Sequence, residues 1–393
     1  MSTDTVPHLI GDQQTGPAHL TTDAAATGHV LIVRASLGGL CLAQGLTKYG
    51  ISCSVFERDD TPDVRLQGYR IKIFADSVPD LQYLTTLELF AEFEAQTAET
   101  VMVKTSVNAI DSRLLARRVR GGPKPYTVHC GKDATHYEID ETNKASPVKV
   151  HFADGSSASG TLLVGADRGR SRIRRQHVLR LKIIHPEAVC LYGRPDLTPE
   201  LERRIQPALL RAMVIVRDVP PVIQQITFDL DLSVNMFVKR LHLPPRGEPG
   251  HEGLPADYMY WSMLTPSKLL GFTEEAQRYL VELQDETFAA SLRVVSITPD
   301  LSEWEASPFV TLIGDAIYVI SPSGGVGAGT AIKDAVALTK ALTGPDGMSL
   351  AGIKAYETTM WAVARASIER SFRGGKLLYG QPPLEKCRVL EDN

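Results

Sequence analysis

The feature that most constrains this chain is a strand–turn–helix–strand pattern near its start. Residues 29–33 (HVLIV) are apolar and rich in β-branched side chains, and they end at the turn RASLGG. An apolar-periodic segment at 40–50 follows and leads into a second strand pattern at 51–57 (ISCSVFE), which ends on an acidic residue. Helical periodicity between two short buried strands predicts a βαβ unit, the building block of parallel sheets.

The turn between the first strand and the helix has the spacing of a dinucleotide-binding loop, but two of its three glycines are missing. In a G-x-G-x-x-G loop the first glycine permits the tight turn, the second lets the backbone approach a pyrophosphate, and the third lets the helix pack on the strand. Those positions are held by Arg34, Ser36 and Gly39. Glu57 ends the second strand, where such units place an acid that bonds the adenosine ribose.

Two further motifs follow in the order found in one protein family. Residues 165–175 (GADRGRSRIRR) resemble the G-A-D-G-x-x-S-x-V-R segment of the class A flavin monooxygenases, the single-chain FAD-dependent aromatic hydroxylases. Residues 314–335 (GDAIYVISPSGGVGAGTAIKDA) resemble the family's G-D-A-x-H-x-x-x-P-x-x-G-x-G-x-N-x-x-x-x-D segment. The matching residues are Asp167, Ser171, Arg174, Asp315, Pro322, Gly325, Gly327 and Asp334. Three motifs in this order, over about residues 29–381, carry the resemblance.

This resemblance implies an α/β fold: a Rossmann-like FAD/NAD(P)-binding domain of flavin hydroxylase type with an inserted, mostly antiparallel substrate sheet layer. The middle of the chain supports the insertion, because it contains successive strand patterns such as MVIVRDV and SVNMFVKRLHL. The N-terminal segment is rich in Thr, Asp, Gly and Ala and lacks the basic and apolar parts of a signal peptide. The expected divisions are a disordered tail at 1–28, a nucleotide domain at 29–180 and 300–350, a substrate sheet at 181–299 and a helical region at 351–393.

The resemblance also implies cofactor contacts, residue by residue. In the family, the acid matched by Asp315 bonds the flavin ribityl chain, and the backbone matched by Gly327 and Gly329 meets the isoalloxazine. A family arginine that contacts the cofactor is matched here by Arg65 or Arg113. The expected cofactor-binding residues are Glu57, Arg65, Arg113, Asp315, Gly325 and Gly327.

Four cofactor-facing positions depart from the family pattern. Arg34 places a Cβ and a long side chain where a glycine would leave room for the pyrophosphate, and Ser36 adds a smaller obstruction. Arg168 replaces a glycine and Gly329 replaces an asparagine. We therefore expect FAD binding to be weakened or lost while the fold persists. Alternatively, FAD still binds through the matching acids and the intact glycine loop, with help from the helix dipole.

Without a flavin, an apolar pocket on this fold could still fold a reactive precursor and accelerate a ring closure. Our leading expectation is a polyketide or terpenoid tailoring enzyme that needs no cofactor, a cyclase or isomerase using a pericyclic, Diels–Alder-type or acid–base route. Tyr318, which replaces a family histidine, is the candidate donor, and Arg70 and Arg194 are further catalytic candidates. The expected cavity wall consists of Tyr69, Tyr258, Tyr260, Trp261 and Pro322.

Two other functions fit the same residues. An FAD- and NAD(P)H-dependent monooxygenase would hydroxylate or epoxidise an aromatic or polyene natural product. A flavoprotein relic would have no catalytic activity. The monooxygenase should be yellow and consume NAD(P)H, the cyclase should be colourless yet active, and the relic should be colourless and inert.

Composition and charge exclude several kinds of partner. A net charge of −4 and a pI near 6.2 argue against nucleic acid and anionic membranes, and the arginine-rich run at 168–176 has no interleaved aromatic residues. No stretch of 18 apolar residues occurs. Five scattered cysteines have no metal-binding spacing and fit reduced thiols. We therefore expect a cytoplasmic protein without a metal, whose partner is a small hydrophobic molecule.

Overall fold

The computed structural model describes residues 28–61, 70–95, 98–102, 105–111, 126–178, 181–205, 207, 210, 214–218, 234–241, 257–266, 288–297 and 304–390. Only the backbone is described at residues 70, 72, 98–111, 214–236 and 288–293 within these ranges. The tail expected at 1–28 lies outside the described residues apart from Gly28, and so do Arg65, Tyr69 and Arg113.

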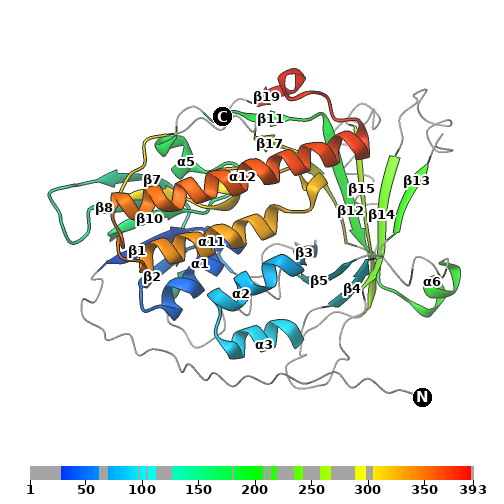
Figure 1. The fold of residues 1–393 in the computed structure, drawn as a ribbon, viewed down its shortest axis with the longest axis horizontal. Helices are drawn as coiled ribbons and strands as arrows, with labels where there is room; N and C mark the ends of the chain where they lie inside the picture. The colour runs from blue at the N-terminus through cyan, green and yellow to red at the C-terminus, as the bar shows by residue number, and fades with distance from the viewer. Residues whose placement is uncertain are drawn as a thin grey trace, which may run out of the picture.

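A five-stranded parallel sheet forms the centre of the molecule (Figure 1). In spatial order its strands are β18 (Val310–Leu312), β10 (Leu162–Gly165), β1 (His29–Val33), β2 (Ser52–Phe56) and β6 (Thr127–His129). Every neighbouring pair is parallel, and Val30 lies opposite both Leu162 and Cys53. β1 and β10 are buried along almost their whole length, because a parallel sheet is covered on both faces. The predicted βαβ unit is therefore confirmed.

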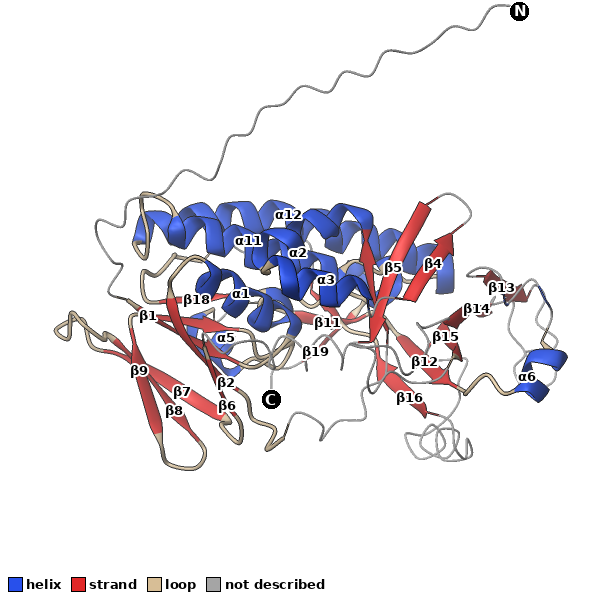
Figure 2. Ribbon diagram, turned by 90° about the horizontal axis from the view of Figure 1, so that it is seen from below, coloured by secondary structure: helices blue, strands red, loops and turns tan. Residues whose placement is uncertain are grey.

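Helices cover one face of this sheet. The helix of the βαβ unit, α1 (Leu37–Lys48), packs against α11 (Gly327–Thr343), and α12 (Leu350–Tyr379) packs on α11 in turn. α2 (Val78–Leu84) lies against α1, and α3 (Leu87–Ala95) lies against α2. Figure 2 shows these helices together on one side of the central sheet.

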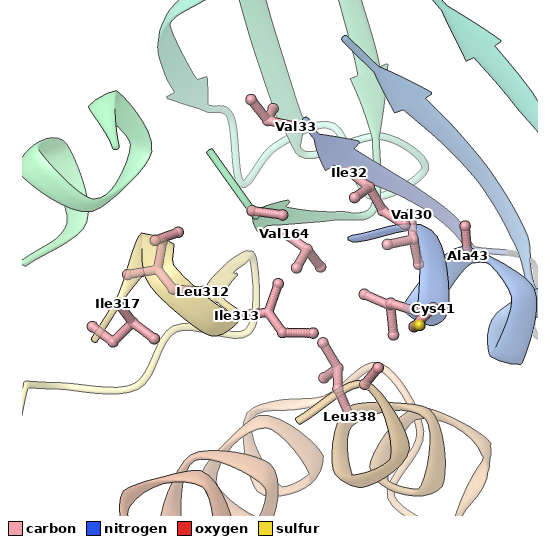
Figure 3. Packing of buried hydrophobic residues seen from close by; sticks show 14 of the residues in the cluster. Val30, Ile32, Val33, Cys41, Ala43, Val164, Leu312, Ile313, Ile317 and Leu338 are labelled. Carbon is pink, nitrogen blue, oxygen red and sulfur yellow. The ribbon is translucent and has the colours of Figure 1, made fainter. Parts of the chain in front are cut away.

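An apolar layer joins the helices to the sheet. Figure 3 shows Val30, Ile32 and Val164 of the sheet packed with Cys41 and Leu338 of the helices. The helices α1 and α11 therefore lie flat on the sheet, and the first turn of each lies near the carboxyl ends of the strands.

A small antiparallel sheet lies on the opposite side of the central sheet (Figure 2). Its strands are β7 (Ala134–Ile139), β8 (Val148–Phe152) and β9 (Ser157–Gly160). The helix α5 (Arg172–His177) packs against β7. A third sheet contains β3 (Arg70–Phe74), β4 (Ala98–Met102) and β5 (Thr105–Asp111), with β5 in the middle.

The inserted antiparallel sheet predicted for the middle of the chain is present. Its strands in spatial order are β13 (Val214–Asp218), β14 (Val234–Leu241), β15 (Tyr258–Pro266), β12 (Ala188–Arg194) and β16 (Phe288–Arg293). The short helix α6 (Pro199–Arg204) follows β12. One face of the sheet packs on the end of α12, where Cys190 and Leu264 join Leu378 and Tyr379 in one apolar cluster. α12 therefore spans both parts of the molecule (Figure 1).

The C-terminal segment is more than a helical region. After α12 it forms a 3₁₀ turn, η4 (Leu384–Lys386), and the strand β19 (Arg388–Leu390). β19 pairs with β11 (Ile183–His185), which also pairs with β17 (Ser296–Ile297). None of the described helices is both long enough and apolar enough to span a bilayer.

Candidate functional site

The three sequence motifs meet at one edge of the central sheet. β1, β10 and β18 are parallel, so their carboxyl ends lie side by side. The Ala166 amide donates to the Val33 carbonyl at 2.9 Å, and the Ile313 amide donates to the Gly165 carbonyl at 3.0 Å. The turns that follow the three strands are therefore neighbours. Ligands of open parallel sheets bind in the crevice beyond this edge.

The third motif opens with a tight turn, η2 (Gly314–Ala316), that is held from α11. Gly314 has a φ of +59°, a left-handed conformation that favours glycine. Asp334 accepts a hydrogen bond from the Gly314 amide at 3.0 Å and another from the Tyr318 hydroxyl. Burial raises the pKa of Asp334 to about 7, and the bond from Tyr318 acts in the opposite direction. This cluster fixes the turn that carries Asp315.

Tyr318 does not line a cavity. Its side chain is 1% exposed, and its hydroxyl donates to Asp334 in the core. A phenol proton that is committed to a buried carboxyl cannot also be donated to a substrate. The expectation that Tyr318 is the catalytic donor is therefore corrected: this residue positions the turn between β18 and the glycine-rich loop.

Asp315 is the acid that this turn presents to solvent. Its side chain is exposed, yet desolvation by the surrounding protein raises its pKa to about 6, while the charge of Arg168 lowers it. The effect of the Arg168 charge on this carboxyl places the second motif beside Asp315.

A glycine-rich loop leads from the Asp315 turn into α11. Pro322 is exposed at the start of the 3₁₀ turn η3 (Pro322–Gly324), and Gly325 follows with a φ of +64°. α11 begins at Gly327, and no described side chain caps its first turn. A Cβ at Gly327 would have no described atom within 4 Å. The first amides of α11 therefore face open space, where they can bind an anionic or carbonyl group.

Gly329, which replaces a family asparagine, lies deeper in the same helix. It is buried, and a Cβ there would lie 2.9 Å from the hydroxyl oxygen of Ser77 in the 3₁₀ turn η1 (Ala75–Ser77). A larger side chain at this position would require Ser77 to move. The substitution therefore matches the local packing.

The second motif supports the same turn from the opposite side. The Arg174 side chain is completely buried, and its Nη1 donates to the carbonyls of Gly169 at 2.9 Å and Ala316 at 3.3 Å. Asp167 accepts the Arg172 amide at 2.8 Å and so caps the start of α5. Sequence periodicity gave no indication of the contact between Arg174 and Ala316, because it joins segments far apart in the chain.

The first motif has a different arrangement, in which Arg34 contacts Glu57. Arg34 has a φ of +93°, although it is not glycine. Its Nε lies 3.5 Å from Glu57 Oε1, and the two side chains are 8% and 5% exposed. Glu57 also accepts the Ala35 amide at 3.0 Å and the Asp59 amide at 3.1 Å. The expected ribose ligand is therefore engaged within the protein.

The other two positions of this motif serve helix α1. Ser36 is the N-cap residue, and its hydroxyl accepts the Gly39 amide at 3.3 Å. A Cβ at Gly39 would lie 2.5 Å from the Arg34 carbonyl oxygen, so the helix approaches the strand too closely for any side chain there. The third glycine thus has the packing role that the motif predicts.

The residues expected to form one cavity wall lie on two faces of the inserted sheet. Tyr258 and Tyr260 alternate with Trp261 along β15, and neighbouring strand residues point to opposite faces. Trp261 lies against Gly193, where a Cβ would be 2.5 Å from the indole nitrogen. Arg194 lies over the ring of buried Tyr258, 4.8 Å from its centroid. Trp261 therefore does not belong with the two tyrosines.

The remaining expected residues are less well defined. Arg70 begins β3, where its backbone lies opposite Asp111. Arg65, Tyr69 and Arg113 lie outside the described residues. Pro322 lies at the glycine-rich loop and away from the inserted sheet in sequence.

One group of possible metal ligands occurs among the described residues, on the β7–β8 hairpin. It consists of His136, Glu138 and His151. The two imidazole rings stack with centroids 4.4 Å apart and planes 2° from parallel. Ring nitrogens bind a metal along directions in the ring plane, so two stacked rings do not converge on one ion.

A parallel nucleotide-binding sheet with an acid-bearing turn and an inserted antiparallel sheet define the class of FAD-dependent hydroxylase folds. A family model described as an FAD binding domain matches residues 300–371. A dual O-methyltransferase/FAD-dependent monooxygenase from Cercospora beticola is 33% identical over 96% of this chain and 50% of that protein. The chain belongs to the class A flavin monooxygenase family. It spans about half the length of the first curated relatives that it matches.

Solved structures agree with this fold. 2,6-Dihydroxypyridine-3-hydroxylase from Arthrobacter nicotinovorans matches with a TM-score of 0.68 at 16% identity, covering 94% of this chain and 99% of that chain. HpxO from Klebsiella pneumoniae, in complex with FAD and uric acid, matches with a TM-score of 0.64 at 18% identity, covering 89% and 88%.

The residues present fit the flavin-ring part of FAD. We call the Asp315 turn, the Gly325–Gly327 loop and the start of α11 the ring end of the site. Here an accessible acid, a left-handed glycine and uncapped helix amides lie together. These are the groups that can bond a ribityl hydroxyl and the carbonyl edge of an isoalloxazine.

The residues present do not fit the adenosine part. We call Arg34, the turn to Ser36 and Glu57 the adenosine end. The Arg34 side chain lies on the acid that would bond the ribose, and both oxygens of Glu57 already have partners in the protein. The contact between Arg34 and Glu57 is the observation that bears on the expected weakening of FAD binding. The FAD binding domain match and the neighbour in complex with FAD favour the alternative, in which FAD binds.

Proposed function

We propose that this chain is a flavin-dependent monooxygenase that oxidises an aromatic or polyene natural product, with NAD(P)H as the electron donor. The observation that carries the proposal is the ring end, where exposed Asp315 lies on a turn that packs against α11, whose first turn has no side-chain cap. A flavin bound there supplies hydride acceptance and oxygen activation.

The chain's own residues bind and orient the cofactor ring. Asp315, which is mostly ionised above about pH 6, would hold a hydroxyl of the ribityl chain as a hydrogen-bond acceptor. The first amides of α11, together with its dipole, favour negative charge on the carbonyl edge of the ring. Asp334 and Arg174 keep the Asp315 turn in place from two sides.

The inserted sheet and the relatives support the proposed substrate class. Half-buried Tyr260 and Arg194 belong to one face of the sheet and would offer an aromatic ring and a cation to a planar substrate, while Tyr258 is completely buried under Arg194. The Cercospora relative combines a monooxygenase with an O-methyltransferase in one chain. O-methylation consumes a hydroxyl group and monooxygenation creates one, so this pairing supports a substrate with phenolic hydroxyls.

A flavin-independent cyclase or isomerase is the second candidate, and the Arg34–Glu57 contact favours it. In this case Asp315, whose raised pKa of about 6 leaves part of it protonated near neutral pH, would act as the general acid in place of Tyr318. The residues around Asp315 would then hold a linear precursor in a folded conformation.

Absorbance and cofactor consumption distinguish the two functions. The purified chain is incubated with excess flavin and desalted, and its visible spectrum and its oxidation of NAD(P)H with aromatic natural products are measured. Flavin bands near one equivalent per chain and substrate-stimulated NAD(P)H oxidation support the monooxygenase. A colourless protein that converts a linear precursor without NAD(P)H would reject it in favour of the cyclase. Asp315→Ala should abolish flavin retention in the first case.

A further inference from the structure

A cavity lies on the face of the central sheet that is opposite the helices, away from the proposed flavin site. Its volume is about 350 Å³, and its lining comes from the central sheet and from the small β7–β9 sheet (Figure 2). We infer that this cavity is a second binding site, for a small aromatic carboxylate. The inference does not depend on the flavin, because the described residues that line the cavity include none from the ring end or the adenosine end.

The apolar lining comes from both sheets. Leu31 of β1 and Phe56 of β2 line the cavity from the central sheet, whereas Val30, the neighbour of Leu31, faces the helices (Figure 3). Phe152 of β8 lies opposite, with its ring centroid 4.9 Å from that of Phe56. The volume and these rings suit a small ligand with a flat apolar body.

The polar lining combines positive charge with hydroxyl groups. The Lys132 ammonium donates to Asp154 at 2.5 Å and to Ser156 at 2.8 Å, so one of its three donors is left for a ligand. The His129 ring stacks on Phe56 with centroids 5.1 Å apart, and no described side chain bonds its ring nitrogens. None of the described lining residues is an acid, and the other polar ones are His29, Ser54, Ser157 and Ser159. This lining favours a ligand that is negatively charged and accepts hydrogen bonds.

Backbone bonds hold Lys132 and His129 on either side of one strand end. The Glu57 amide donates to the His129 carbonyl at 2.8 Å, and the Lys132 amide donates to the Glu57 carbonyl at 2.8 Å. Both donors therefore come from fixed backbone, which reduces the ordering that a ligand must impose when it binds. Substitution of either side chain leaves these backbone bonds intact.

The charge of the lining favours a carboxylate over a phosphate. A phosphate monoester carries about −1.5 to −2 charges at pH 7 and is usually bound by arginine or by helix amides. The described lining contains neither an arginine nor the start of a helix, and Lys132 is its one ammonium group. Burial, with a smaller effect of His129, lowers the pKa of His29 and so favours its neutral form. Lys132 and His129 can each donate to one oxygen of a carboxylate.

Titration calorimetry of the full chain with benzoate tests this site. Benzamide serves as an uncharged ligand of the same shape, and inorganic phosphate serves as an anion without an apolar body. We expect benzoate to bind with a Kd on the order of 1 mM or below, and the other two at least about tenfold more weakly.

Three variants locate the bound benzoate. Lys132→Gln should weaken its binding at least about tenfold, because the ammonium is lost. His129→Phe keeps the stack on Phe56 but removes the ring nitrogens, and it should weaken binding about fivefold. Lys149→Gln is the matched control: Lys149 is an exposed residue of β8 outside the cavity, so its substitution should leave binding unchanged.

Several results would overturn the inference. Benzoate binding that Lys132→Gln or His129→Phe leaves unchanged would mean that the ligand is held elsewhere, for example on the inserted sheet. Equal binding of benzamide would reject the acidic group, and equal binding of phosphate would reject the aromatic body. No binding of benzoate at about 10 mM would reject the site itself. Flavin retention and NAD(P)H oxidation test the proposed monooxygenase separately, so either idea can fail while the other stands.

Discussion

The ring end and the adenosine end lie on the same edge of the central sheet, but the side chains at the two ends make different kinds of contact. At the ring end, Asp334 and Arg174 bond the backbone of the turn itself, so their removal would disturb the fold as well as the site. At the adenosine end, the Arg34 side chain lies against Glu57, and both side chains are almost completely buried. Gly39 differs from the other residues of this end, because a side chain there would meet the backbone carbonyl of Arg34. The ring-end contacts therefore hold the backbone of a turn, whereas the contact between Arg34 and Glu57 joins two side chains.

Among the variants that test this comparison, Arg174→Ala has the largest expected effect on stability. The variant leaves the carbonyls of Gly169 and Ala316 without their donor and opens space in the core. We expect a loss of about 3–4 kcal/mol in the free energy of unfolding, measured by urea denaturation. Arg172→Ala is the control, because its side chain is 46% exposed, so its ion pair with Asp133 and its bond to the Ala134 carbonyl together contribute about 1 kcal/mol or less. Equal losses in the two variants would contradict the structural role of Arg174.

Gly39→Ala tests the one constrained glycine of the adenosine end. The added Cβ would meet the Arg34 carbonyl at 2.5 Å, so α1 must move away from β1. We expect unfolding to become about 2 kcal/mol easier in thermal or urea denaturation. The control is Gly327→Ala, whose Cβ would enter open space and should change stability by less than about 0.5 kcal/mol. That control should instead weaken flavin binding, since it narrows the ring end.

Tyr318→Phe tests the support of the Asp315 turn and its dependence on pH. The variant should lose about 1–2 kcal/mol of stability, because Asp334 loses a buried donor. The pKa of Asp334 is about 7 in the folded protein, above its ordinary value, so this acid lowers stability as the pH rises from about 4 to 7. Tyr318 lowers that pKa, and its removal raises it further. The loss should therefore be larger at pH 8 than at pH 5.5.

Tyr356→Phe is the matched control for this pH dependence. The Tyr356 hydroxyl is also buried, but it donates to the Leu312 carbonyl, which does not titrate. Its removal should cost a similar free energy with little change between the two pH values. The same pH dependence in both variants would argue against the Tyr318–Asp334 bond as the cause.

The sequence predicted the fold well and the site unevenly. Strand and helix periodicity with three ordered motifs predicted the parallel sheet, and Asp315 was identified from its motif. The contact between Arg34 and Glu57 was not predicted, because it joins the ends of two strands and leaves no periodic signal in the sequence. The bond from Arg174 to Ala316 and the buried bond from Tyr318 to Asp334 were not predicted for the same reason. Trp261 could have been separated from Tyr260 by strand alternation alone.

Among the test variants, Arg168→Gly is expected to have the smallest effect on stability. It tests how Arg168 acts on Asp315 at the ring end. Arg168 has a φ of +66°, so glycine relieves backbone strain and should stabilise the fold by up to about 1 kcal/mol. The charge of Arg168 lowers the pKa of Asp315, and its removal should raise that pKa above about 6. If ionised Asp315 binds the ribityl chain, the pH midpoint of riboflavin binding should shift upward in the variant. Arg170→Gly removes an exposed arginine of the same loop and should leave this midpoint unchanged. An unchanged midpoint would mean that Arg168 does not act on the acid that binds the cofactor.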